Sequence, residues 1–140
     1  MSFLDTIIAN LPSTNGLLPS WLLFISAVSV FNSAQTYVAD TKLTKRVYEA
    51  APEQVTPLSA RTFGTWTMMA SMIRFFGAYY ISNPAIYNMT IWTFVLAGFH
   101  FGTEWLVFGT AKLGKGLAGP LFTVALTLPW MILQRDFYVQ

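Results

Sequence analysis

MTIWTFVLAGFHFGTEWLVFGT, residues 89–110, decides the fold class of this chain. As a helix this stretch is long enough to cross the ~30 Å hydrocarbon core of a bilayer, since each helical residue adds ~1.5 Å. It nevertheless contains two ionisable residues, His100 and Glu104, which are four positions apart and therefore share one helix face. A charge at the bilayer centre costs at least ~2.5 kcal/mol, so these residues need a partner, a cavity or a task.

Membrane-spanning helices are also predicted over three further stretches: residues 17–38, 59–81 and 117–133. Charged residues make up only 10% of the chain, against about 25% in a typical soluble domain, and hydrophobic residues make up 54%. So few charges cannot cover a water-soluble surface. We therefore expect an all-α integral membrane protein, a small bundle of four transmembrane helices that forms a single domain over residues 1–140.

The basic residues predict how this bundle is oriented. They concentrate in the hydrophilic segment 39–58, at the start of the second span and in the turn 111–116. Six of the eight are found there: Lys42, Lys45, Arg46, Arg61, Lys112 and Lys115. The positive-inside rule then places the segment 39–58 and the turn 111–116 in the cytosol and both termini in the lumen.

Arg74 lies in the second predicted span, so with His100 and Glu104 the membrane region holds three ionisable residues. They form either a catalytic or proton-relay site, or a structural polar cluster that fixes the helix register; we favour the structural cluster. Arg74 and Glu104 differ in predicted depth by roughly 10 Å. A direct ion pair between them needs a favourable register, and Arg74 can instead extend to a lipid headgroup. His100 lies at the intermediate depth and is expected to link the two.

Gly98 and Gly102 form a G-xxx-G step, which allows close helix–helix approach. By helical angle this packing face lies roughly opposite the face of His100 and Glu104. Packing inside the bundle explains the step as well as association of two copies of the chain does, so a homo-oligomer stays open.

Several classes of protein are excluded by the residues that the chain lacks. Without cysteine there is no disulfide, no thiolate catalysis and no cysteine-ligated metal. One histidine and one glutamate supply only two ligands, whereas catalytic zinc needs three from the protein, so no metal is expected. Gly114-Lys115-Gly116 matches neither phosphate-binding glycine motif, so no cofactor is expected either. The basic residues are too few and too dispersed for a nucleic-acid partner.

Several strings together resemble the ergosterol biosynthetic protein 28 family. They are LSARTFGTWT (58–67), Arg74, IWTF (91–94), His100-Phe101 with Glu104, Asn32-Ser33-x-Gln35 and Phe108-Gly109-Thr110. The residues that we assign to the family motif are Arg61, Thr62, Phe63, Gly64, Trp66, Thr67 and Trp92.

The resemblance implies a multi-pass protein of the endoplasmic-reticulum membrane that acts in sterol biosynthesis without catalysing a reaction. Members tether the enzymes of sterol C-4 demethylation: the sterol C-4 methyl oxidase, the sterol C-3 dehydrogenase/decarboxylase and the 3-keto sterol reductase. The sterol C-24 methyltransferase is a further implied partner, and membrane lipids surround the spans.

Two alternatives to a scaffold remain. The first is a small intramembrane sterol-modifying enzyme, with Glu104 as the acid, His100 as the base and Arg74 as electrostatic support. The second is a sterol-binding protein, either a carrier or a channel-like oligomer, in which the polar face of residues 89–110 lines a cavity.

Overall fold

The computed structural model describes residues 2–12, 16–38 and 41–139, and within these ranges every regular element is a helix. The elements are α1 (Phe3–Ala9), α2 (Leu18–Val38), α3 (Lys42–Val47), a 3₁₀ turn (Pro52–Gln54), α4 (Pro57–Tyr79), α5 (Pro84–Leu106), α6 (Lys115–Leu133) and α7 (Arg135–Tyr138). The prediction of an all-α fold is confirmed. The first two residues of the predicted hydrophilic segment, 39 and 40, lie outside the described ranges.

Helix length and composition single out two candidate membrane spans, α2 and α6. Two such helices are weak evidence for a membrane protein, because the core helix of a soluble protein also passes this test. α4 and α5 are each 23 residues long, but both contain ionisable residues along their length: Arg61 and Arg74 in α4, and His100 and Glu104 in α5. Four membrane crossings therefore stay a prediction.

Capping residues explain why α4 and α5 begin earlier than the predicted spans. At the start of α4, Thr56 and Ser59 form a reciprocal capping box, and Pro57 occupies the first helical position. At the start of α5, the Asn83 side chain accepts hydrogen bonds from the backbone N–H groups of Ala85 and Ile86. The connection between α4 and α5 is consequently a tight turn.

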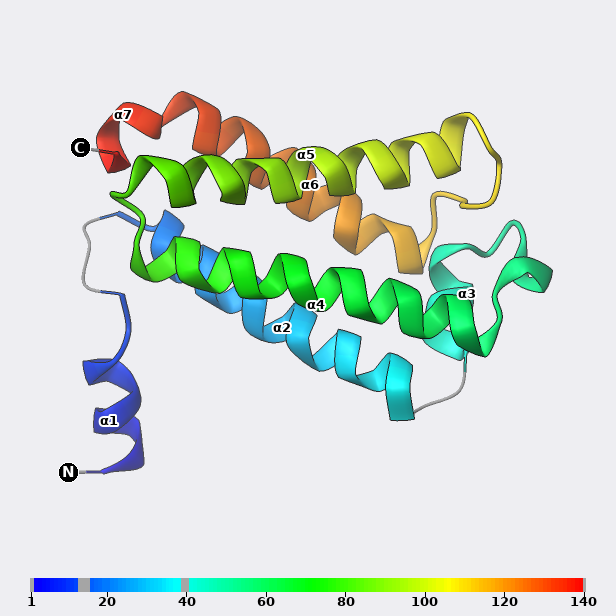
Figure 1. The fold of residues 1–140 in the computed structure, drawn as a ribbon, viewed down its shortest axis with the longest axis horizontal. Helices are drawn as coiled ribbons and strands as arrows, with labels where there is room; N and C mark the ends of the chain where they lie inside the picture. The colour runs from blue at the N-terminus through cyan, green and yellow to red at the C-terminus, as the bar shows by residue number, and fades with distance from the viewer. Residues whose placement is uncertain (1, 13–15, 39–40, 140) are drawn as a thin grey trace.

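The four long helices form two antiparallel pairs that are joined through α4 and α5 (Figure 1). α2 packs along most of α4, and α6 packs along α5. Figure 1 shows α3 and the α5–α6 turn at one end of the bundle, with the α4–α5 turn and the C-terminus at the other. α3 closes its end of the bundle by packing on the start of α6.

Close approach of α2 and α4 depends on Gly64. A Cβ atom at this position would lie 3.0 Å from the carbonyl oxygen of Ser33 and would overlap the side chain of Thr36. Beside it, the hydroxyls of Ser33 and Thr67 share a hydrogen bond of 2.7 Å across the same interface. These contacts fix the antiparallel register of the two helices: Thr36 lies level with Gly64 and Ser33 lies level with Thr67.

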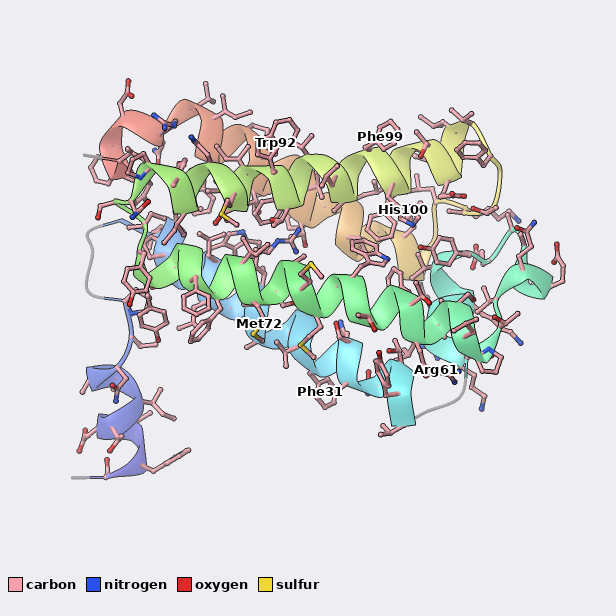
Figure 2. All side chains as sticks on the ribbon, in the orientation of Figure 1. Phe31, Arg61, Met72, Trp92, Phe99 and His100 are labelled. Carbon is pink, nitrogen blue, oxygen red and sulfur yellow. The ribbon has the colours of Figure 1, made fainter. Side chains whose placement is uncertain are left out.

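The interior of the bundle combines apolar core clusters with buried hydroxyl groups, and its outer faces are largely apolar. Small hydroxylated residues are buried between the helices: Ser26, Ser33, Thr36, Ser71, Thr90, Thr93 and Thr127. Large apolar residues cover the outer faces instead, and Phe99 and Trp92 are 69% and 60% exposed. Figure 2 shows both on the side of α5 that faces away from α4. Buried small and hydroxylated residues are typical of helix contacts within membranes.

Candidate functional site

Arg74 connects α4 to α5 in the interior of the bundle. Only 8% of its surface is exposed. Its Nε donates to the Thr93 hydroxyl at 2.9 Å, and its Nη2 donates to the Thr93 carbonyl oxygen at 3.3 Å. The guanidinium carbon lies 3.9 Å from the centre of the Phe94 ring, a cation–π distance. Within the described part of the chain, Arg74 is thus held by hydroxyl, carbonyl and aromatic groups rather than by a carboxylate.

His100 lies further along α5, on the side that faces α4 (Figure 2). Its Nε2 shares a hydrogen bond of 2.5 Å with the hydroxyl of Tyr48, which directly follows α3. The rings of Trp66 and Phe101 pack edge-on against the imidazole, with centroids 5.4 and 5.2 Å away. The hydrogen bond between Tyr48 and His100 attaches the hydrophilic segment to the long helices.

Glu104 organises the end of α5 and the turn that follows. Its carboxylate accepts a hydrogen bond from the Thr110 hydroxyl at 2.5 Å, and its backbone carbonyl accepts from the N–H groups of Thr110 and Ala111. Burial raises the pKa of the Tyr48 hydroxyl above its ordinary value, and the negative charge of Glu104 raises this pKa further. Tyr48 therefore keeps its proton well beyond physiological pH.

The structure does not bring Arg74, His100 and Glu104 into one cluster. Arg74 is bonded to Thr93, which precedes His100 by seven residues, or roughly 10 Å along a helix. His100 and Glu104 share one face of α5, as their spacing predicts, but each bonds to a different partner. The physical reason is the register of the α4–α5 hairpin, which sets Arg74 opposite Thr93. The structural role of the trio stays a prediction.

The two glycines of the G-xxx-G step have different surroundings. A Cβ atom at Gly98 would lie 3.0 Å from a methyl group of Val124, so Gly98 allows α5 to approach α6. A Cβ atom at Gly102 would meet nothing within 4 Å. Among the residues that the structure describes, Gly98 but not Gly102 is therefore used in packing inside the bundle.

The predicted motif residues divide into three groups. Gly64 and Thr67 belong to the α2–α4 interface, and Phe63 and Trp66 belong to the aromatic cluster around His100. The remaining members are exposed: Arg61, Thr62 and Trp92.

Sequence reasoning missed Tyr48 and Thr93, the partners of His100 and Arg74. Thr93 had a detectable sequence signal, because the small residues Thr90, Thr93 and Ala97 recur at helical spacing. The structure shows that all three are buried on one face of α5. Tyr48 had none, since nothing in a hydrophilic segment indicates which helix it packs against. Among the described residues, no group of three or more His, Cys, Asp or Glu side chains could hold a metal ion.

Known proteins match this chain over most of its length. The family model described as Erg28 like protein matches residues 18–128. Ergosterol biosynthetic protein 28 of Candida albicans is 63% identical over 130 residues, which cover 92% of this chain and 94% of the relative. The Saccharomyces cerevisiae protein of that name is 53% identical over 133 residues, covering 95% and 88%.

The human homolog is 38% identical over 115 residues, covering 82% of each chain. No solved structure matches the chain. Because the family model covers far more than half of the chain and several relatives align along nearly their whole length, the chain belongs to the Erg28 family, whose members are named for ergosterol biosynthesis.

Proposed function

We propose that this chain is a non-catalytic scaffold of the endoplasmic-reticulum membrane, which holds the enzymes of sterol C-4 demethylation together. Those enzymes are the sterol C-4 methyl oxidase, the sterol C-3 dehydrogenase/decarboxylase and the 3-keto sterol reductase, with the sterol C-24 methyltransferase as a further partner. Gathering them in one place raises the effective concentration of each intermediate at the next enzyme without any new chemistry.

One observation carries this proposal: the chain belongs to a family named for ergosterol biosynthesis, yet among the described residues Arg74, His100 and Glu104 do not converge on one centre. Arg74 is bonded to Thr93, His100 to Tyr48 and Glu104 to Thr110. The names of the relatives describe a biosynthetic protein and name no reaction.

All four long helices cross the membrane in this proposal. The exposed apolar side chains of α4 and α5 support this, because a soluble monomer rarely exposes contiguous apolar patches of more than a few hundred Å². Examples are Met69 and Phe76 on α4, and Leu96 and Phe99 on α5. The basic residues at the α3 end of the bundle favour a cytosolic position for that end.

Because the chain has no cysteine, single-cysteine variants test this topology directly. Lys45 in α3 and Ser82 in the α4–α5 turn are both exposed, and Figure 1 shows these two elements at opposite ends of the bundle. In sealed microsomes, Lys45→Cys should react with a membrane-impermeant maleimide, and Ser82→Cys should react only after the membrane is permeabilised. Equal labelling of both variants in sealed vesicles would contradict the proposed crossing.

The scaffold role is tested by affinity purification of the tagged chain in mild detergent, followed by mass spectrometry. We expect enrichment of the three C-4 demethylation enzymes over an unrelated multi-pass protein of the same membrane. The proposal fails if none is enriched and a deletion strain makes sterols normally. Turnover of a sterol by the purified chain, abolished in His100→Ala, would support the enzyme alternative instead.

A further inference from the structure

A cleft runs between α2 and α6 on the inner side of the bundle. The two helices are connected where Trp21 Nε1 donates a hydrogen bond to the Thr127 hydroxyl at 2.8 Å, and residues of α3 line the cleft as well. The space between them has a volume of about 430 Å³, and α4 and α5 form its floor. It is lined along α2 from Trp21 to Thr36, roughly 22 Å of helix. Its size and mostly apolar lining are typical of small-molecule sites.

Arg74 lines this cleft and has donor groups to spare. A guanidinium carries five N–H donors. The structure records hydrogen bonds from Nε and Nη2 to Thr93, and none from Nη1 within the described residues. None of the buried side-chain nitrogen or oxygen atoms described lacks a partner, so Nη1 is not sealed in the protein. A cation that is 92% buried, paired with no carboxylate and open to the cleft is a site for an anionic oxygen.

Two further polar groups face the cleft from α2. Ser29 and Asn32 lie one turn apart, and the structure records no hydrogen bond for either side chain within the described part of the chain. Three other hydroxyl groups of α2 behave differently: Ser26, Ser33 and Thr36 are buried and bonded. An unsatisfied amide inside a membrane costs several kcal/mol. Asn32 is exposed at the side of the cleft, so its amide is accessible and supplies a second hydrogen-bonding point for a ligand.

The helix register gives the spacing between the two points. Arg74 is level with Ser26 on α2, because Ser33 pairs with Thr67 and Gly64 meets Thr36. Asn32 is six residues beyond that level, which is roughly 9 Å along the helix. A ligand that satisfies both residues needs polar groups at two ends of a body about that long.

From these contacts we infer that the α2–α6 cleft binds a steroid-like carboxylic acid, with its carboxylate at Arg74 and a hydroxyl or keto oxygen near Asn32. A rigid ring system keeps its two polar ends at a fixed separation, and it loses less conformational freedom on binding than an acyl chain does. The rings of Phe63, Trp66 and Phe101 pack together along the floor and offer a broad apolar surface to such a body.

The end of the cleft next to α3 contains Arg46 and Lys115, which are both exposed. Their position at the α3 end is explained by the membrane–water interface, so they need no ligand. A lipid with its headgroup there would place its apolar tail against the Arg74 guanidinium, which is unfavourable. The buried cation therefore selects a ligand whose acidic group enters the cleft.

The test is equilibrium binding to the purified full-length chain in nanodiscs, read from tryptophan fluorescence and from retention of a radiolabelled ligand. The probe is a hydroxysteroid carboxylic acid, with its hydroxyl on the first ring and its carboxylate on the last. Its neutral methyl ester and oleate are the comparison ligands. We expect saturable binding of the acid, at least about tenfold tighter than that of the ester, as for a charge-assisted hydrogen bond. Oleate should compete weakly.

Three variants locate the site. Arg74→Gln should remove the preference for the acid over the ester, whereas Arg61→Gln, an exposed arginine outside the cleft, should keep it. Gly119 lines the cleft, and a Cβ added there meets nothing within 4 Å, so Gly119→Leu is expected to narrow the cleft. It should weaken acid binding at least tenfold while the chain stays folded, which keeps the test valid if Arg74→Gln misfolds.

Four outcomes would overturn this inference: non-saturable uptake of every ligand, equal affinity for acid and ester, stronger binding of oleate than of the steroid acid, or unchanged binding in Gly119→Leu. Binding is measured on the purified chain alone, so its failure leaves the scaffold role untouched. Failure of enzyme co-purification likewise says nothing about the cleft.

Discussion

Gly64→Ala should destabilise the bundle by breaking the close contact of α2 with α4. The added methyl group would lie 3.0 Å from both the Ser33 carbonyl oxygen and the Thr36 Cβ, and closer still to the Thr36 hydroxyl. Thr36 cannot swing away cheaply, because its hydroxyl donates to the Ser33 carbonyl at 2.6 Å. Overpacking of this kind costs ~1–3 kcal/mol.

Gly102→Ala is the matched control. It makes the same chemical change inside a long helix, but its methyl group meets nothing within 4 Å. Both variants gain up to ~1 kcal/mol of helix propensity, so the difference between them isolates the clash at Gly64. At about 3 °C per kcal/mol, Gly64→Ala should have a Tm about 3–9 °C below that of Gly102→Ala.

The assay is thermal unfolding in detergent, followed by the fluorescence of the five tryptophans. Adding Thr36→Ala to Gly64→Ala removes the clashing hydroxyl and should recover part of the lost stability. Equal Tm values for Gly64→Ala and Gly102→Ala would refute the α2–α4 packing described above.

The remaining predictions concern α5 and its surroundings. Glu104→Ala should lower the steady-state protein level or complex assembly, measured by immunoblot and pull-down, because the turn to α6 loses the acceptor of the Thr110 hydroxyl. Unchanged level and assembly would contradict this role. Glu104→Gln should lower the pKa of Tyr48, because a charge that raises it is removed. Ultraviolet titration against a Tyr48→Phe control checks the sign, and no downward shift would refute the electrostatic contact.

Much of the fold follows from the sequence, since long apolar stretches separated by Pro, Asn and Gly indicate helices and turns. The predicted stretches 17–38 and 117–133 differ from α2 and α6 by no more than two residues at either end. The early starts of α4 and α5 were harder to predict, because Pro57 and Pro84 are compatible with either a turn or a first helical turn. Only their neighbours Thr56 and Asn83 decide between the two.

The candidate site was predictable only in part. Arg74, His100 and Glu104 stand out by their chemistry alone, since charges are rare in apolar helices. Their hydrogen-bond partners depend on the register of the α4–α5 hairpin and on where α3 packs. No local sequence pattern indicates either of these. An uncertainty of one turn in register moves a side chain by ~5 Å, enough to separate Arg74 from His100. The cleft depends on how α2 and α6 are placed relative to each other, which no local sequence pattern indicates.

The central claim is that this chain brings separate enzymes together. The most direct measurement compares cells that contain the chain with cells that lack it. Tagged sterol C-4 methyl oxidase would be purified in mild detergent from cells with and without it. Recovery of the C-3 dehydrogenase/decarboxylase and the 3-keto reductase would be quantified by mass spectrometry. The scaffold account predicts that both co-purify when the chain is present and are lost when it is absent, at unchanged enzyme levels. Equal recovery from the two strains would contradict it.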